Sequence, residues 1–293
     1  MSTGLPDISL RQLEYLTAVV DSPTWAAAAN RVGVSASALS QGLAELERRV
    51  GVELFESHGR RRILRPSAAP VLDHARRVVA LTGDLVDWSQ RIRTAHGGRV
   101  RLGMIDIAAV VHFPTVLQEF RAEFPDVELT LSVAPSAQLL DALRDGQIDI
   151  VVCVAPPSVR PGIATAPLFD EALRVIAPAS ARIGDAASWG PWLMFPGDSH
   201  TRHLIEERLR QLGAPIVIAA ASHQPEVLHQ MARLGLGWAV LPVAQTNATD
   251  DVAAGGVVAG PELVHRQLVV ARRSESVTDP AVDELDRRLH QRV

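Results

Sequence analysis

Apolar residues in the first 31 positions recur at helical spacing in two segments. The first segment begins at Ser9, where Ser9 and Gln12 match the capping box in which each side chain accepts from the other's backbone N–H, and it ends before Pro23. Its inward positions are expected to be Leu10, Leu13, Leu16, Val19 and Val20. Thr24 is the expected N-cap of a second, alanine-rich helix over residues 25–31.

A third helix is predicted between Ser35, its expected N-cap, and Gly51, which stands where a left-handed C-terminal residue belongs. Its buried stripe consists of Leu39, Leu43, Leu46 and Val50. The face turned away is small, polar or basic and consists of Ser37, Ser40, Gln41, Ala44 and Arg48. Such a face suits the major groove of a duplex, where phosphates and base edges need hydrogen bonds, but an ordinary amphipathic surface helix has the same pattern.

Two short helices joined by a turn at Gly33 form a helix-turn-helix. Residues 53–55 and 62–64 are predicted as two strands around a tip at His58-Gly59, which makes a wing. The arginines of this wing place positive charge beside a phosphate backbone. We therefore predict DNA contact by Thr24, Ser35, Ala36, Ser37, Ser40, Gln41, Arg48, Arg60, Arg61, Arg62 and Arg65.

A long periodic segment follows the wing, from Ser67, its expected cap, to His96. One stripe repeats every seven residues at Val71, Val78, Leu85 and Ile92, and an adjoining stripe is formed by Leu72, Val79 and Val86. A sustained heptad pattern favours a partner helix, although a helix that packs on its own domain gives the same pattern.

From Arg99 onward, short apolar segments alternate with amphipathic helices. Strands are predicted over residues 100–104, 127–133, 148–154, 173–177, 192–195, 216–220, 238–241 and 263–271. The expected helices are one carrying Val110, Val111, Leu117, Phe120 and Phe124, one capped by Ser136, two over residues 201–212 and 225–233, and a last one opened by Thr278-Asp279-Pro280. Alternation of this kind implies right-handed crossovers and a parallel sheet.

The first 95 residues resemble the winged helix-turn-helix of LysR-type transcriptional regulators. The matching residues, in order and at the right spacing, are Leu10 to Leu13, Ala28-Ala29, Val34-Ser35, Ala38 to Ser40, Leu46-Glu47, Gly51-Val52 and Leu54 to Glu56. The family commonly has other residues, with more DNA-contacting side chains, where this chain has Ala26-Ala27, Ala36-Ser37, Gln41-Gly42 and Ser57.

The resemblance implies an α/β fold class with three parts: an N-terminal winged helix-turn-helix over residues 1–66, a linker and dimerisation helix over 67–98, and a two-lobed effector-binding domain over 99–293, similar to periplasmic binding proteins. Lobe I is expected over 99–166 and 267–293, and lobe II over 167–266. It also implies operator DNA, a small-molecule effector and further copies of the chain, as a homodimer or homotetramer, as partners. RNA polymerase is a candidate further partner.

Composition fits a globular protein of two or three units, with 293 residues of which 47% are hydrophobic and 21% are charged. The net charge of −4 does not point to nucleic acid, but the positive charge is clustered, and all 29 basic residues are arginine. Cys153 is the single cysteine, which excludes an intrachain disulfide and cysteine-cluster metal sites. The sequence contains no membrane-length apolar run and no signal peptide, so a cytoplasmic protein is expected.

Effector contacts are expected where strand carboxyl ends meet helix N-termini. The resemblance places these ends in the cleft between the lobes, at Asp106, Ile107, Ser136, Phe195, Ser199, His200, Thr201, Arg202 and His223. Hydroxyls near residue 200, with Arg202, suit a carboxylate, although a capped helix with a surface arginine has the same sequence. Asp106 would favour an amine or hydroxyl, unless it is only a helix cap.

Other classes of protein fit less well. The histidines at 200, 203, 223 and 229 form no ordered ligand set, so no metal is expected, and no cofactor is implied. Gly235-Leu-Gly237 lacks a third glycine, and no nucleophile elbow or P-loop is present, so no enzymatic activity is expected. The alternatives are a winged-helix regulator of another family, or a small-molecule binding protein without DNA activity.

Overall fold

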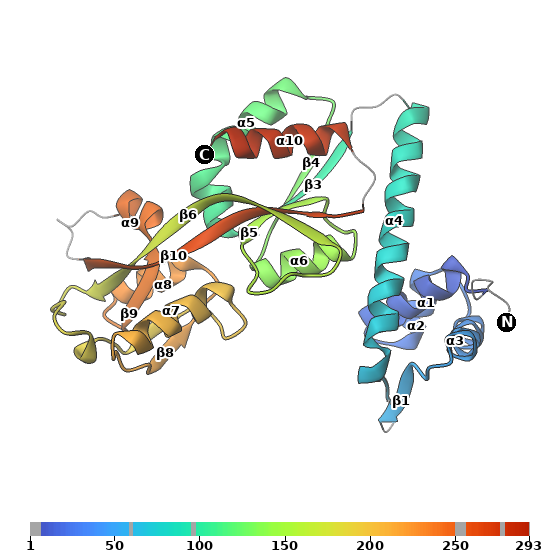
Figure 1. Ribbon diagram of the computed structural model, residues 1–293, viewed down its shortest axis with the longest axis horizontal. Coiled ribbons are helices and arrows are strands. Elements are labelled where there is room, and N and C mark those ends of the chain that lie inside the picture. The colour runs from blue at the N-terminus through green and yellow to red at the C-terminus, as the bar shows by residue number, and fades with distance from the viewer. Residues whose placement is uncertain (1–6, 59–60, 95–97, 250–255, 276–278, 293) are drawn as a thin grey trace. The chain divides into compact units, whose positions relative to one another are not determined.

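The computed structural model describes residues 7–58, 61–94, 98–249, 256–275 and 279–292 (Figure 1). The chain divides into two compact units, one made mainly of residues up to 94 and the other mainly of residues from 95 onward. The first unit contains a helical domain and a long helix, and the second contains an eight-stranded sheet with helices.

The N-terminal unit contains the helices and hairpin that the sequence predicts. Its elements are α1 (Leu10–Asp21), α2 (Trp25–Arg31), α3 (Ala36–Val50), β1 (Phe55–His58) and β2 (Arg61–Leu64). The capping box of Ser9 and Gln12 is present, with both reciprocal hydrogen bonds, and Gly51 ends α3 with a φ of 73°. These local signals fix the helix ends because each satisfies backbone groups that a helix terminus leaves without partners.

The wing begins two residues later than predicted. Leu54 is fully buried in the N-terminal core, and the Glu47 carboxylate accepts hydrogen bonds from the backbone N–H groups of Leu54 (2.8 Å) and Phe55 (3.4 Å). The chain at residues 53–54 is therefore held by the end of α3 and not by a strand ladder, which starts at Phe55 opposite Leu64.

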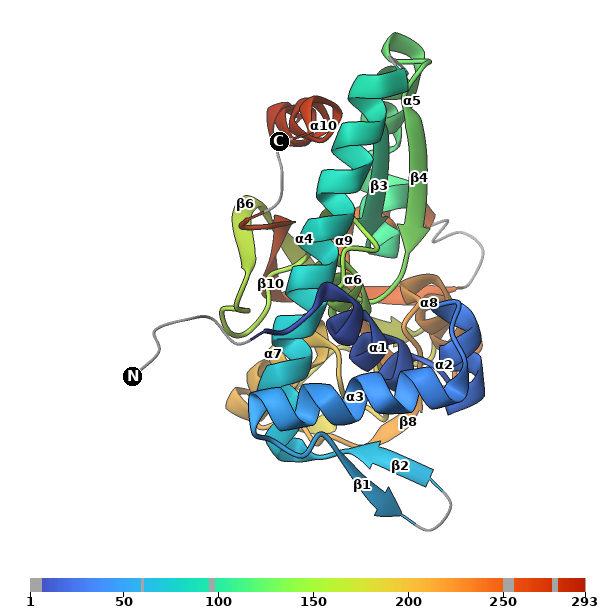
Figure 2. The same cartoon turned by 90° about the vertical axis from the view of Figure 1, so that its right-hand side faces the viewer.

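The long helix α4 spans Ala69–Thr94 and follows a 3₁₀ turn over Pro66–Ala68. Ser67 lies inside this turn, so the prediction that it caps the long helix is wrong: the turn begins after Arg65 and carries no side-chain cap. Leu72 and Ala75 are buried against α1, which packs beside α4 (Figure 2), whereas Leu85, Val86 and Trp88 are exposed. The described C-terminal part of α4 thus carries an apolar surface of its own.

The C-terminal unit is built on one mixed sheet with the strand order β4-β3-β5-β10-β6-β9-β7-β8. The strands are β3 (Arg99–Met104), β4 (Glu128–Val133), β5 (Ile150–Val154), β6 (Ile163–Pro178), β7 (Trp192–Met194), β8 (Ile218–Ala221), β9 (Trp238–Pro242) and β10 (Val257–Arg273). The helical elements are a π-helical turn η2 (Ala108–His112), α5 (Pro114–Glu123), α6 (Ser136–Arg144), a 3₁₀ turn η3 (Ala186–Ser188), α7 (His200–Gln211), α8 (Pro225–Arg233), α9 (Val243–Thr249) and α10 (Pro280–Gln291).

Two hydrophobic cores lie along this sheet. The lobe I core gathers β3, β5 and helices α5, α6 and α10, and the lobe II core gathers β7, β9 and helices α7 and α8 around Trp189, Trp192 and Trp238. The predicted parallel pairing holds within each lobe, for β3 with β4 and β5 and for β7 with β8 and β9. The antiparallel strands β6 and β10, much longer than predicted, run through both lobes (Figure 1).

Several local predictions in this unit need correction. The expected helix through Val110 is a π-helical turn followed by α5, and Val110 is 73% exposed instead of inward. Ser136 is the first residue of α6 and not its cap, because its hydroxyl accepts a hydrogen bond from the Val154 N–H (3.2 Å). Asp279 caps α10, while Thr278 lies outside the described residues, and α9 was not predicted.

Candidate DNA-binding surface and effector cavity

The N-terminal half of α3 presents a small, polar surface. Ser35, Ala36, Ser37 and Gln41 are exposed, and Ser40 is half-buried. The Ser35 hydroxyl accepts the Ala38 N–H (3.1 Å), as predicted for an N-cap, and Thr24 caps α2 in the same way. Each hydroxyl keeps its own hydrogen as a donor toward a ligand. This surface has the size and polarity that a major groove admits.

Two of the arginines that were predicted to contact DNA, Arg48 and Arg65, form ion pairs with carboxylates of the same domain. Arg48 is exposed and paired with Glu45 (2.5 Å), which also receives Arg49. Hydrogen bonds from Arg48 and Arg49 lower the pKa of the half-buried Glu45 carboxyl to about 2. On the wing, Arg65 pairs with Glu53 (2.6 Å). Arg60 and the side chain of Arg61 lie outside the described residues.

Arg62 connects the wing to α2. Its guanidinium lies over the Trp25 ring, 5.2 Å from the centroid, and Trp25 meets Phe55 edge to face at 5.4 Å. The three side chains come from β2, α2 and β1, so they fix the hairpin against the helix-turn-helix. A cation over an indole face is stabilised by the ring quadrupole, and this contact was not predicted from the sequence.

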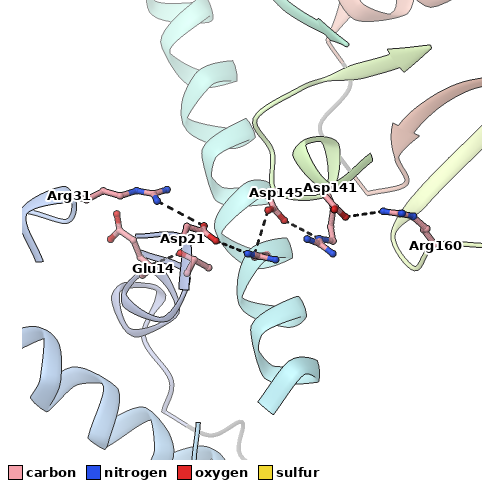
Figure 3. Close-up of polar contacts among 9 residues, drawn as sticks. Glu14, Asp21, Arg31, Asp141, Asp145 and Arg160 are labelled. Carbon is pink, nitrogen blue, oxygen red and sulfur yellow. Dashed lines mark hydrogen bonds and ion pairs between the residues drawn. The ribbon is translucent and has the colours of Figure 1, made fainter. Parts of the chain in front are cut away.

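Ion pairs also connect neighbouring elements in both units (Figure 3). Arg31 at the end of α2 lies 4.0 Å from Asp21 at the end of α1, and Arg160 donates to Asp141 of α6 at 2.9 Å. Both pairs are largely solvent-exposed, so each contributes little to stability.

A cavity of about 340 Å³ opens in the C-terminal unit at the carboxyl ends of β3, β5 and β7. The structure brings together in its wall all but one of the predicted effector residues, namely Asp106, Ile107, Ser136, Phe195, Ser199, His200, Thr201 and His223. Arg202 does not line it, so its predicted position is wrong. Its Nε donates to Glu206 one turn along α7 (2.7 Å), and its Nη1 donates to the Phe195 carbonyl (3.3 Å).

Arg266 of β10 lines the cavity instead and was not predicted. It is 4% exposed, and it stands opposite Glu171 of β6 in the strand register. Its Nε donates to Glu171 Oε2 (2.7 Å), its Nη2 lies 2.6 Å from the same oxygen, and its Nη1 donates to the Thr201 hydroxyl (2.8 Å). A buried arginine needs such a set of acceptors, because an unpaired buried charge is very costly.

His112 completes this buried network. Its Nε2 lies 2.5 Å from Glu171 Oε1, and its ring packs edge to face on Phe169 at 4.9 Å. Burial alone would raise the pKa of Glu171, but Arg266 and His112 outweigh it and hold that pKa below its usual range. The carboxylate is therefore ionised and accepts from both neighbours. The network joins the π-helical turn of lobe I, β6, β10 and the start of α7.

Two ionisable groups in the cavity wall have shifted pKa values. Burial raises the pKa of Asp106, and Glu226 adds to this effect while Arg266 opposes it. Burial lowers the pKa of His200, whose buried Nδ1 has no hydrogen-bond partner among the described residues. The wall thus contains an imidazole that loses its proton more readily than usual and a carboxyl group that holds its proton more tightly than usual.

Three further observations limit the chemistry. Within the described ranges, no group of three or more His, Cys, Asp or Glu residues is arranged to hold a metal ion. No helix in the described part of the chain is both long and apolar enough to cross a bilayer. Cys153 is fully buried in β5, and burial raises the pKa of its thiol to about 12.

Comparison with known proteins agrees with this architecture. A relative from Streptomyces viridosporus, a probable hydrogen peroxide-inducible genes activator, is 33% identical over 60% of this chain and 56% of its own length, so the chain spans little more than half of that relative. A full-length OxyR variant from Pseudomonas aeruginosa has a TM-score of 0.67 at 22% identity, over 97% of this chain and 98% of that chain. CbnR complexed with its target DNA has a TM-score of 0.61 at 20% identity, over 97% and 100%. These two structures share the fold.

Two family patterns together cover nearly all of the chain. The pattern of the bacterial regulatory helix-turn-helix proteins of the lysR family matches residues 10–69. The pattern of the LysR substrate binding domain matches residues 93–293, which include the whole cavity wall. The chain belongs to the LysR family of transcriptional regulators.

Proposed function

We propose that this chain binds operator DNA through α3 and the β1–β2 wing, and that a small-molecule effector in the 340 Å³ cavity alters this binding. The supporting observation is that one chain combines an exposed polar surface on a helix-turn-helix with a cavity inside its substrate-binding domain. The proposed division is a DNA-binding domain over 1–66, a linker helix over 67–98 and an effector-binding domain over 99–293, with lobe II over 167–266.

The proposed assembly is a homodimer or homotetramer paired through α4. Two copies of a recognition helix read half-sites one helical turn apart only if the copies are related by symmetry. Among the described side chains of α4, the large apolar ones exposed toward a partner are Leu85, Val86 and Trp88. The name of the DNA-bound CbnR structure supports DNA as a partner. Such a regulator acts in the cytoplasm, where it meets the chromosome and RNA polymerase.

The proposed function does not include a peroxide-reactive thiol, although one relative is named as a probable activator of hydrogen peroxide-inducible genes. The nucleophile toward a peroxide is the thiolate. Cys153 is the only cysteine of the chain, and its buried thiol has a pKa of about 12. A bound effector is therefore the better account of regulation, and regulation without catalysis matches the family.

The DNA part of the proposal is tested by Gln41→Ala and Arg60→Ala, with Gln291→Ala on α10 as the control. Gln41 is exposed on the α3 surface, and an amide that reads a base edge contributes about 1–3 kcal/mol of discrimination. Its loss should therefore change sequence preference. Loss of Arg60 should weaken operator and random DNA alike and reduce the salt slope by roughly one unit. Equal effects of both variants on both DNAs would contradict this division.

A further inference from the structure

We propose that the effector is a small organic cation whose ammonium group pairs with the Asp106 carboxylate. This inference rests on the proposed function of the cavity as the effector site. It concerns the sign of the ligand charge and the residue that recognises it. A cavity of about 340 Å³ is at the small end of ligand sites, so the cation is of metabolite size.

The first argument is the charge of the cavity wall. Among the described residues that line the cavity, the charged groups are Asp106, Asp198 and Arg266. The guanidinium of Arg266 is already paired with Glu171, so this ion pair contributes no net charge. Two carboxyl groups remain. The wall therefore has an excess of negative charge, which favours a cation.

The second argument is that Arg266 is not available to an anionic ligand. Its Nε and Nη2 face Glu171 and its Nη1 faces Thr201, and all three side chains are buried. A ligand carboxylate that took Arg266 would leave Glu171 buried without its cation, at the cost of breaking a buried pair. Arg202, the third residue of α7, is held outside the wall by Glu206.

The third argument concerns the hydrogen bonds and charges that surround the Asp106 carboxylate. Its carboxylate receives the backbone N–H of Ile107, and among the described residues no side chain donates to it. Burial raises its pKa, and the nearby Glu226 and Glu171 act in the same direction against Arg266. A half-buried carboxylate in such surroundings is poorly compensated. An ammonium group supplies both the missing charge and up to three donors.

A neutral hydroxyl ligand is the main competitor, because a protonated Asp106 can bond to it. The two ligands differ in their response to pH. Ammonium binding requires ionised Asp106, so its affinity rises as pH increases through the raised pKa of Asp106, whereas an alcohol gains nothing from this ionisation. The other titratable groups in or facing the wall are His200, His223, Asp198, Glu171 and Glu226.

The test uses three matched probes with the full-length chain: hexylamine, hexan-1-ol and hexanoate, each titrated by calorimetry. We expect hexylamine to bind at least tenfold more tightly than the other two. Asp106→Asn should reduce hexylamine affinity at least tenfold, whereas Glu284→Gln on α10, a carboxyl group that does not line the cavity, should change it less than twofold. Equal or tighter binding of hexanoate, or no binding of hexylamine, overturns the proposal.

The pH dependence on the unmodified chain provides a second measurement that does not depend on how Asp106→Asn folds. Hexylamine affinity should rise between pH 4 and pH 7, with proton release on binding, and a flat profile overturns the proposal. Operator binding measured with each probe separates this inference from the proposed function. If hexanoate binds and changes operator affinity, the cavity is the effector site and the cation proposal fails. If hexylamine binds through Asp106 without changing operator affinity, the preference of the cavity for a cation stands, but its proposed function as the effector site fails.

Discussion

Replacing Glu171 by Gln tests whether the buried network stabilises the effector domain. Glu171 and Arg266 are both nearly inaccessible, and the carboxylate is the only anion that Arg266 contacts among the described residues. The substitution keeps the size of the side chain but leaves a buried guanidinium without compensation. Removing one partner of a buried pair costs about 3–5 kcal/mol. For a domain of roughly 200 residues this corresponds to a fall in Tm of roughly 6–20 °C.

The assay is denaturant unfolding of the full-length chain followed by tryptophan fluorescence. Trp189, Trp192 and Trp238 lie together in the lobe II core, so most of the signal reports on the half of the domain that holds the network. The matched control is Glu284→Gln on α10, which removes a carboxylate that pairs with Arg287 and Arg288 of the same helix and should lower the midpoint far less, because these pairs remain open to solvent. A midpoint for Glu171→Gln that equals the control would refute the reasoning.

The pH dependence of the same measurement gives an independent check. The pKa of Glu171 is lower in the folded chain than in the unfolded chain, where it is about 4.3. A depressed carboxyl pKa contributes stability that is complete above the unfolded pKa and is lost as pH falls through the folded pKa. The difference in stability between wild type and Glu171→Gln should therefore be constant above about pH 5 and should shrink below pH 4.

Three further predictions follow from burial and exposure. Cys153 should resist iodoacetamide and hydrogen peroxide in the folded chain and react only after unfolding; fast labelling of the native chain would contradict its burial and raised pKa. Leu85→Arg should produce smaller particles in sedimentation and weaker operator binding, because Leu85 is 53% exposed on the apolar surface of α4; an unchanged assembly would show that this surface is not an interface. Trp25→Ala should weaken operator binding by releasing Arg62 and the wing, and unaltered affinity would show that the wing is positioned without this contact.

The elements that the sequence predicts best are those fixed by local chemistry. The limits of α1, α2 and α3 follow from Ser9, Thr24, Ser35 and Gly51, each of which satisfies or terminates backbone hydrogen bonds within one turn. The apolar stripe of α3 is likewise readable because its period is a property of the helix alone. Winged helix-turn-helix architecture could therefore be predicted almost completely.

Long-range pairing explains what could not be predicted. The middle of β6 is interrupted by Pro167, Asp170 and Glu171 and the start of β10 by Gly260 and Pro261, so neither is recognisable as a strand, yet β6 and β10 pair along most of their length. Their strand character depends on a neighbour about 95 residues away, which no local pattern contains. The shift of the wing has a similar origin, since Glu47 on α3 decides where β1 begins.

The effector cavity shows both sides of this limit. The positions of the strand ends in the sequence predicted most of the residues in the cavity wall. They indicated Arg202 as the positively charged side chain of the wall, however, and not Arg266. The signal for Arg266 was present: a charged residue beside a strand of buried apolar residues requires a partner of opposite charge. The sequence did not reveal that Glu171 is this partner, because their cross-strand register exists only in the folded sheet.

The buried network also changes the role expected for Thr201. Its hydroxyl, predicted to contact the effector, also accepts a hydrogen bond from Arg266, so Thr201 fixes the start of α7 to β10 as well as lining the cavity. At the same point His112 fixes the π-helical turn of lobe I to β6 through Glu171. Asp106 precedes this turn, and Phe195 precedes α7, so both walls of the cavity are attached to one buried ion pair. Because β6 and β10 are continuous through both lobes, we expect a change in lobe closure to bend these strands near that pair, and a ligand bound to both walls to shift the equilibrium there.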